Sequence, residues 1–198
     1  MDQIVDIIEE HLPSMPGWCT PEKGVRLAEL ALHRSLCVEL GVFGGRSLVA
    51  IALALRHQGF GQVHGIDPFT KEAALEGSNE KANDEWWSGL DYEAIAREAQ
   101  TTIYKLELTH FAQIIRMRSQ DVAQFYDNGT VDLCHQDSNH SEEISCEEVE
   151  LWSPKIRPGG IWVFDDTNWP TTKKAQERLL ELGFFELENN ETWKVYSK

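Results

Sequence analysis

Hydrophobic residues recur along the chain in two different periods, which separate strand-like segments from helix-like segments. Short apolar runs predict five buried strands, at residues 35–40, 61–67, 111–118, 130–137 and 161–166. Apolar residues spaced three and four apart predict helices between them, at residues 44–57, 91–108, 120–127, 142–155 and 171–182. Strands that alternate with helices predict an α/β fold with a mostly parallel sheet and helices on both faces.

The two ends of the chain add further elements to this pattern. Residues 1–34 predict two helices, and the second begins with Thr20 as N-cap and Pro21 at the first helical position. Residues 184–197 predict an antiparallel hairpin that turns at Asn189 and Asn190. The whole chain, 1–198, is therefore predicted to form a single domain with a seven-stranded sheet.

Two segments interrupt the regular alternation. Residues 70–91 have poor periodicity and many acidic side chains, including Glu80, and they predict an insertion that hangs over the strand ends like a lid. The segment "RPGG" at residues 157–160 predicts a turn, with Pro158 and Gly159 at its two central positions.

The charge and the cysteine content of the chain indicate which binding partners and which cellular compartment to expect. The chain has 18 basic and 33 acidic residues, a net charge of −15, which argues against binding to nucleic acid or to an anionic membrane surface. The N-terminus lacks the pattern of a signal peptide, so we expect a cytoplasmic protein. The four cysteines have no C-x-x-C spacing, and we expect them to be reduced.

Ligands of open α/β sheets bind at the carboxyl ends of the strands, so the residues that follow each strand are the most informative. The first strand ends in "VELGVFGGRS", where Gly41 permits a sharp turn and the next helix begins near Gly45 and Ser47. Phe43 replaces the second glycine of a dinucleotide fingerprint, which argues against a bound pyrophosphate. A plain strand-to-helix turn remains an alternative for this motif taken alone.

The other strand ends also carry polar residues. Asp67 follows the second strand, where a carboxylate can accept both hydroxyls of a ribose. Ser119 and Gln120 follow the third strand, where they can contact an adenine edge, although Ser119 can equally cap a helix. Asp137 and His140 follow the fourth strand, and Asp165 and Asp166 the fifth. This row of polar strand ends predicts one site.

These residues resemble a known enzyme family. The order E-x-G-x-x-x-G, then "GIDPF", then D-x-x-H-x-x-E, then "PGGIWVFDD" is similar to class I S-adenosylmethionine-dependent methyltransferases over roughly residues 20–170. Within that class the chain most resembles small-molecule O-methyltransferases of the catechol and of the macrocin and mycinamicin sugar types. The resemblance implies a Rossmann-like, doubly wound sheet.

The resemblance also implies roles for individual residues. Glu39, Gly41, Phe43 and Ser47 match the motif around the methionine part of the cofactor, Asp67 matches the ribose acid, and Ser119 and Gln120 match the adenine-edge positions. Asp137, Asp165 and Asp166 match ligands of Mg²⁺ or Mn²⁺, the metals that oxygen ligands favour. His140 stands where catechol-type enzymes place a lysine base, and histidine is a capable base near neutral pH.

The acceptor is expected to be a small molecule, and two rival functions stay open at this point. Trp18, Trp86, Trp87 and Trp169 can line an aromatic pocket, or they can simply pack under loops. Cephalosporin hydroxylase-like proteins share the motif set, but His135, the second histidine of such a site, is expected to lie deeper in its strand. A cofactor-binding protein without catalysis is the second rival. A homodimer also stays open.

Overall fold

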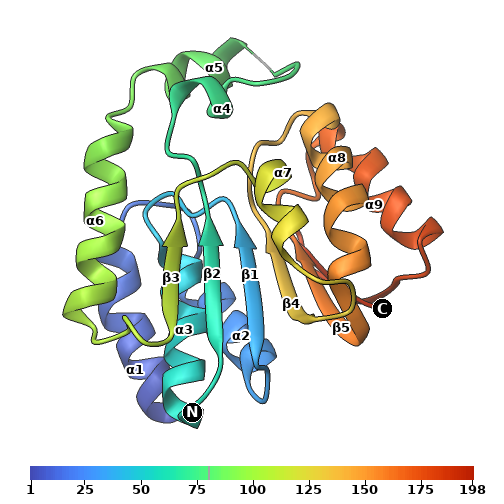
Figure 1. Ribbon diagram of the computed structural model, residues 1–198. Helices are drawn as coiled ribbons and strands as arrows, with labels where there is room; N and C mark the ends of the chain where they lie inside the picture. Colours follow the sequence, from blue (N-terminus) through green and yellow to red (C-terminus); the bar gives the residue numbers. More distant parts are fainter. Residues whose placement is uncertain (80) are drawn as a thin grey trace.

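The computed structural model describes residues 1–79 and 81–198, so that Glu80 of the predicted insertion lies outside the described residues. The described chain forms one sheet in the order β3-β2-β1-β4-β5-β7-β6. Figure 1 labels the first five strands of this order. The first five strands run parallel, and β7 pairs antiparallel with both β5 and β6. The bounds are β1 Leu36–Leu40, β2 Gln62–Ile66, β3 Ala112–Ile115, β4 Val131–Gln136, β5 Ile156–Phe164, β6 Phe185–Asn189 and β7 Lys194–Ser197. The predicted fold class is confirmed.

Helices cover both faces of this sheet (Figure 1). One layer holds α1 Asp2–His11, α2 Pro21–Ala31, α3 Arg46–Gln58 and α6 Tyr92–Lys105. The other layer holds α7 Ser119–Val122, α8 Glu142–Trp152 and α9 Lys173–Glu181. Each layer closes its own hydrophobic core against the sheet. In the first core, every α3 residue from Ser47 to Leu55 is buried.

The sheet reverses its strand order between β1 and β4, and this point positions the site. The chain leaves β1 through α3 toward β2 on one side, and it later returns to β4 on the other side of β1. Two backbone hydrogen bonds join the ends of neighbouring strands. The Gly41 N–H, after β1, donates to the Ile66 carbonyl of β2 (2.9 Å), and the Asp137 N–H, after β4, donates to the Leu40 carbonyl of β1 (2.8 Å). A crevice at such a switch point is where open α/β sheets bind ligands.

The start of α2 agrees with the sequence prediction. The Thr20 side chain accepts a hydrogen bond from the Lys23 N–H (3.2 Å), and Pro21 occupies the first helical position. Thr20 thereby satisfies one N–H that would otherwise lack a partner, and Pro21 lacks an N–H at a position where none is needed. These two residues therefore fix the position in the chain at which α2 begins.

Two predictions about local structure need correction. The "RPGG" segment does not precede the fifth strand but lies inside β5, as a bulge where the register with β4 jumps from Val131–Ile156 to Leu133–Ile161. Within the bulge, Gly159 has the left-handed φ of +73° that the predicted turn requires, and its N–H donates a hydrogen bond to the Lys198 carbonyl (2.8 Å). The predicted helix at 120–127 is also shorter, since α7 passes into the 3₁₀ turn η2 Ala123–Phe125.

The remaining expectations concern the insertion, the cysteines and the membrane. Residues 70–91 contain two short helices, α4 Lys71–Ala74 and α5 Lys81–Ser88, which lie beyond the carboxyl ends of the strands (Figure 1). All four cysteines are free, as predicted. Within the described part of the chain, every helix is too short or too polar to cross a membrane.

Candidate active site

A cavity of about 800 Å³ opens at the carboxyl ends of the strands, beneath the insertion. Ten of the eleven residues predicted for the site line this cavity, namely Gly41, Phe43, Ser47, Asp67, Ser119, Gln120, Asp137, His140, Asp165 and Asp166. The exception, Glu39, lies beneath the cavity floor. The strand ends thus converge on one site, as their order along the sheet predicts.

Gly41 brings two strand ends into close backbone contact. Its φ of +85° is left-handed, and a Cβ built on it would lie 2.1 Å from the Asp137 carbonyl oxygen. An added side chain would therefore meet both unfavourable backbone torsions and a direct clash. This turn lets the Gly41 loop pass directly over the end of β4.

Glu39 supports the site from below rather than lining it. Its carboxylate is fully buried; it accepts a hydrogen bond from the Ser47 hydroxyl (2.9 Å), and its Oε2 lies 3.4 Å from His135 Nδ1. Burial of a carboxylate is costly unless such partners compensate it. Glu39 thus fixes the first turn of α3 relative to β4.

Asp67 organises the loop that follows β1. Its Oδ2 accepts hydrogen bonds from the N–H groups of Val42 (2.9 Å) and Phe43 (3.0 Å), and its Oδ1 from that of Phe69 (2.7 Å). Burial raises the pKa of Asp67, while these three N–H groups favour the ionised form. Oδ1, which has a single N–H donor, retains a second lone pair that can accept a ligand hydroxyl.

A buried glutamate that the sequence analysis did not single out stands at the β3 and β4 end of the cavity. Glu148 of α8 contacts the hydroxyls of Ser119 and Ser138 and accepts a hydrogen bond from the Gln136 amide (2.9 Å). Burial raises its pKa. Ser119 therefore anchors the start of α7 to α8, and Gln120 is the more available polar group of that pair.

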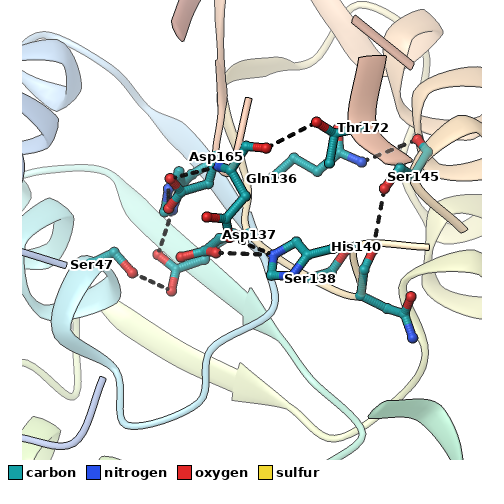
Figure 2. Close-up of polar contacts among 12 residues, drawn as sticks. Ser47, Gln136, Asp137, Ser138, His140, Ser145, Asp165 and Thr172 are labelled. Carbon is teal, nitrogen blue, oxygen red and sulfur yellow. Dashed lines mark hydrogen bonds and ion pairs between the residues drawn. The ribbon is translucent and has the colours of Figure 1, made fainter. Parts of the chain in front are cut away.

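Asp137, His140 and Asp166 form a compact charged cluster. His140 Nε2 lies 2.8 Å from Asp166 Oδ2 and 3.9 Å from Asp137 Oδ1. Figure 2 shows the contact between His140 and Asp137. Burial alone would lower the pKa of His140, but the two carboxylates raise it to about 10. Burial and the nearby Asp165 charge raise the pKa of Asp137 to about 6.

Lys23 is a second site residue that the sequence analysis missed. It projects from the first turn of α2 to the cavity, where its ammonium pairs with Asp165 Oδ2. Burial alone would lower the pKa of Lys23, but the charges of Asp137 and Asp165 raise it above its usual value. Asp165 has its pKa lowered correspondingly, because Lys23 outweighs the effect of burial.

His135 lies within β4, beneath the charged cluster, as its strand position predicts. Its Nε2 is 3.7 Å from Asp165 Oδ2, and the side chain is fully buried. Burial and Lys23 alone would lower its pKa, but Asp165 and Glu39 raise it to about 9. His135 therefore connects Glu39 to Asp165 under the cavity floor.

Four aromatic rings gather at the mouth of the cavity. Trp18 stacks on Phe43 (centroids 5.3 Å apart), and Trp86 and Trp87 of α5 meet them edge-on. Trp18 is 64% exposed and Trp86 is 45% exposed, so both rings present a face that a ligand in the cavity can contact. On the far side, Trp169 packs against His140 (5.0 Å). The predicted lid segment thus supplies an aromatic wall.

Comparison with known proteins identifies the family. Residues 38–167 match the family described as "Methyltransferase domain". No curated protein matches the chain. Similar solved structures include the O-methyltransferase NovP, with a TM-score of 0.75 and 12% identity over 100% of this chain and 97% of that one.

Two further structures share the fold and hold a cofactor or its product. The O-methyltransferase TomG from Streptomyces achromogenes, involved in tomaymycin synthesis and solved with SAM, has a TM-score of 0.63 and 15% identity, covering 100% of this chain and 90% of its own. A Bacillus cereus O-methyltransferase in complex with SAH has a TM-score of 0.63 and 15% identity, covering 100% and 92%. The chain belongs to the methyltransferase-domain family, and it shares its fold with O-methyltransferases that were solved with SAM and SAH.

Proposed function

We propose that the protein transfers a methyl group from S-adenosylmethionine to a hydroxyl oxygen of a small-molecule acceptor. One observation carries the proposal: the Asp137–His140–Asp166 cluster opens onto the same cavity as the Gly41 turn and Asp67. A proton-accepting group therefore shares the cavity with the residues that match the family's cofactor positions.

The cavity residues have the chemistry that the cofactor requires. The N-terminus of α3, at Gly45, receives no side-chain cap, so its N–H groups can donate hydrogen bonds to the methionine carboxylate. Asp67 offers a carboxylate for the ribose hydroxyls, and Gln120 and Ser119 offer polar atoms for the adenine edge. When bound, S-adenosylmethionine supplies the electrophilic methyl group.

His140 is the group we propose as the base. Only its neutral form can accept a proton, and because its pKa is raised to about 10, turnover is expected to rise as the pH increases toward that value. An acceptor hydroxyl is a weak nucleophile until it loses its proton, and a positioned base removes that proton as the oxygen–carbon bond forms. Asp166, 2.8 Å away, and Asp137, 3.9 Å away, stabilise the imidazolium that results. The aromatic wall of Trp18, Phe43, Trp86 and Trp87 favours an acceptor with a flat or ring-shaped body.

Metal assistance, which the family resemblance implies, does not enter this proposal. A divalent ion at Asp137, Asp165 and Asp166 would compete for Asp165 with the Lys23 ammonium. In the described chain, the groups of residues close enough to hold an ion are His135–Asp137–Asp165 and Asp137–His140–Asp166, so the three aspartates do not form one such group. Each group has one histidine and two carboxylates, which also disfavours the two-histidine site of an oxygenase.

Turnover with labelled cofactor tests the function. The protein is incubated with S-adenosylmethionine carrying a radioactive methyl group and with a panel of phenols, catechols and sugars. We expect label in at least one hydroxylated acceptor and none in matched acceptors whose hydroxyl is already methylated. Label that instead enters amine or thiol acceptors alone would contradict an O-methyltransferase.

A further inference from the structure

Lys23 occupies a position that packing alone does not explain. It lies in the first turn of α2, which begins with Thr20 as N-cap and Pro21 at the first helical position, and its side chain is only 7% exposed. Lysine is almost never this buried unless it is paired. Its ammonium reaches the cavity rather than the protein surface, and it contacts Asp165 at the end of β5.

The Lys23 ammonium occupies a carboxylate oxygen of Asp165 that a metal ion would need as a ligand. Asp165 Oδ1 already accepts a hydrogen bond from the Asp166 N–H (3.0 Å), and Asp165 Oδ2 faces Lys23 and, at 3.7 Å, His135. A divalent ion bound at Asp165 would lie beside a fixed positive charge, and like charges at such short range repel strongly where water is scarce. The Lys23 ammonium therefore already supplies a positive charge at this point of the cavity.

We propose that the Lys23 ammonium takes the place of the divalent ion expected from the family, so that this enzyme transfers methyl groups without a metal. The inference rests on the methyl transfer proposed above. Lys23 donates a hydrogen bond to the acceptor oxygen and stabilises the negative charge that develops on it. The hydroxyl proton passes to the neutral form of His140, the oxygen–methyl bond forms as the sulfur–methyl bond breaks, and Lys23 keeps its own protons throughout.

Manganese binding separates this proposal from a metal-dependent site, and it does not require turnover. Free Mn²⁺ is followed by electron paramagnetic resonance during titration of the wild-type protein, Lys23→Met and Lys174→Met. Lys174 pairs with Glu142 on the surface and is a matched control. We expect the wild type and Lys174→Met to bind Mn²⁺ no better than millimolar. We expect Lys23→Met, whose Asp165 is released, to gain a site at least tenfold tighter.

Two outcomes would overturn the proposal. One is micromolar Mn²⁺ binding by the wild type that Asp165→Asn abolishes. The other is a folded Lys23→Met protein that binds Mn²⁺ no better than the wild type. The wild-type titration needs no variant, so a Lys23→Met protein that fails to fold leaves the test intact.

Activity and cofactor binding complete the test. Once an acceptor is known, EDTA is expected to leave wild-type turnover unchanged, and Lys23→Met is expected to lower kcat at least tenfold. Loss of turnover in EDTA that Mg²⁺ restores would contradict the proposal. Calorimetry with S-adenosylhomocysteine in EDTA separates a failure of the proposed methyl transfer from a failure of the role of Lys23. If the product does not bind, the proposed function is wrong. If the product binds normally but the wild type also binds Mn²⁺ tightly, only the role of Lys23 is overturned.

Discussion

Replacing Gly41 by alanine tests whether the close approach of two strand ends builds the cofactor site. A Cβ at this position would lie 2.1 Å from the Asp137 carbonyl oxygen and 2.7 Å from Ser138 Cα, and the φ of +85° is left-handed. The left-handed torsion costs an alanine about 1–2 kcal/mol. Relief of the clash by backbone shifts adds about 1–3 kcal/mol.

Gly59 provides the matched control. It ends α3 with a φ of +81°, and a Cβ there would meet nothing within 4 Å. Gly59→Ala therefore carries the torsional cost without the clash. For a chain of this size each kcal/mol lowers Tm by about 2–4 °C, so we expect Gly59→Ala to lose about 2–8 °C and Gly41→Ala about 4–20 °C.

The two variants should also differ in cofactor binding. Calorimetry with S-adenosylhomocysteine is expected to give a dissociation constant at least tenfold weaker for Gly41→Ala, because the Gly41 loop and Asp137 must move apart. Gly59→Ala is expected to bind like the wild type, since it lies at the other end of α3 from the cavity. Equal losses of Tm and equal binding in both variants would refute the reasoning.

Three other predictions follow from the contacts of His140, Trp18 and Asp132. His140→Ala is expected to lower kcat by about 10²–10⁴ in the labelled-methyl assay and to leave product binding unchanged, whereas full activity would remove His140 as base. Trp18→Ala is expected to raise the acceptor KM severalfold with little change in Tm, while Tyr104→Ala, which changes an aromatic residue 74% exposed outside the cavity lining, should leave KM unaltered. Asp132, which binds the Ser35 and Leu36 N–H groups and Arg157, has a pKa lowered in the fold: burial alone would raise it, and these partners outweigh burial. The ionised Asp132 therefore contributes to the free energy of unfolding above its unfolded pKa of about 3.9, and this contribution is lost as pH falls through the lower folded pKa. The difference in unfolding free energy between wild type and Asp132→Asn, measured by urea melts, should therefore disappear in strong acid. A difference that does not change with pH would contradict this.

The sequence predicts the sheet well because local pattern and topology rules agree. Each strand is a short apolar run, and strands joined by helices must run parallel with their polar ends at one edge. The bulge in β5 was missed because Pro158 and Gly159 specify a local turn but do not reveal that Gly159 pairs with Lys198. That contact joins residues far apart in the sequence.

The two site residues that were missed share one sequence signal. Lys23 lies on the same helix face as Leu27 and Ala31, and Glu148 lies one turn before Trp152, so both are charged residues on apolar helix faces. A charge in that position must find a partner inside the fold. The sequence cannot name the partner, because Lys23 meets Asp165 across 142 positions of chain.

Binding of S-adenosylhomocysteine to the wild type and to Asp67→Asn is the most direct test of the cofactor site. Calorimetry is expected to show one product molecule bound per chain, weakened about 10–100-fold by Asp67→Asn, because charge-assisted hydrogen bonds to the ribose are lost. Binding of NAD under the same conditions is expected to be undetectable. Equal product affinity in the two proteins, or no product binding to the wild type, would contradict the account.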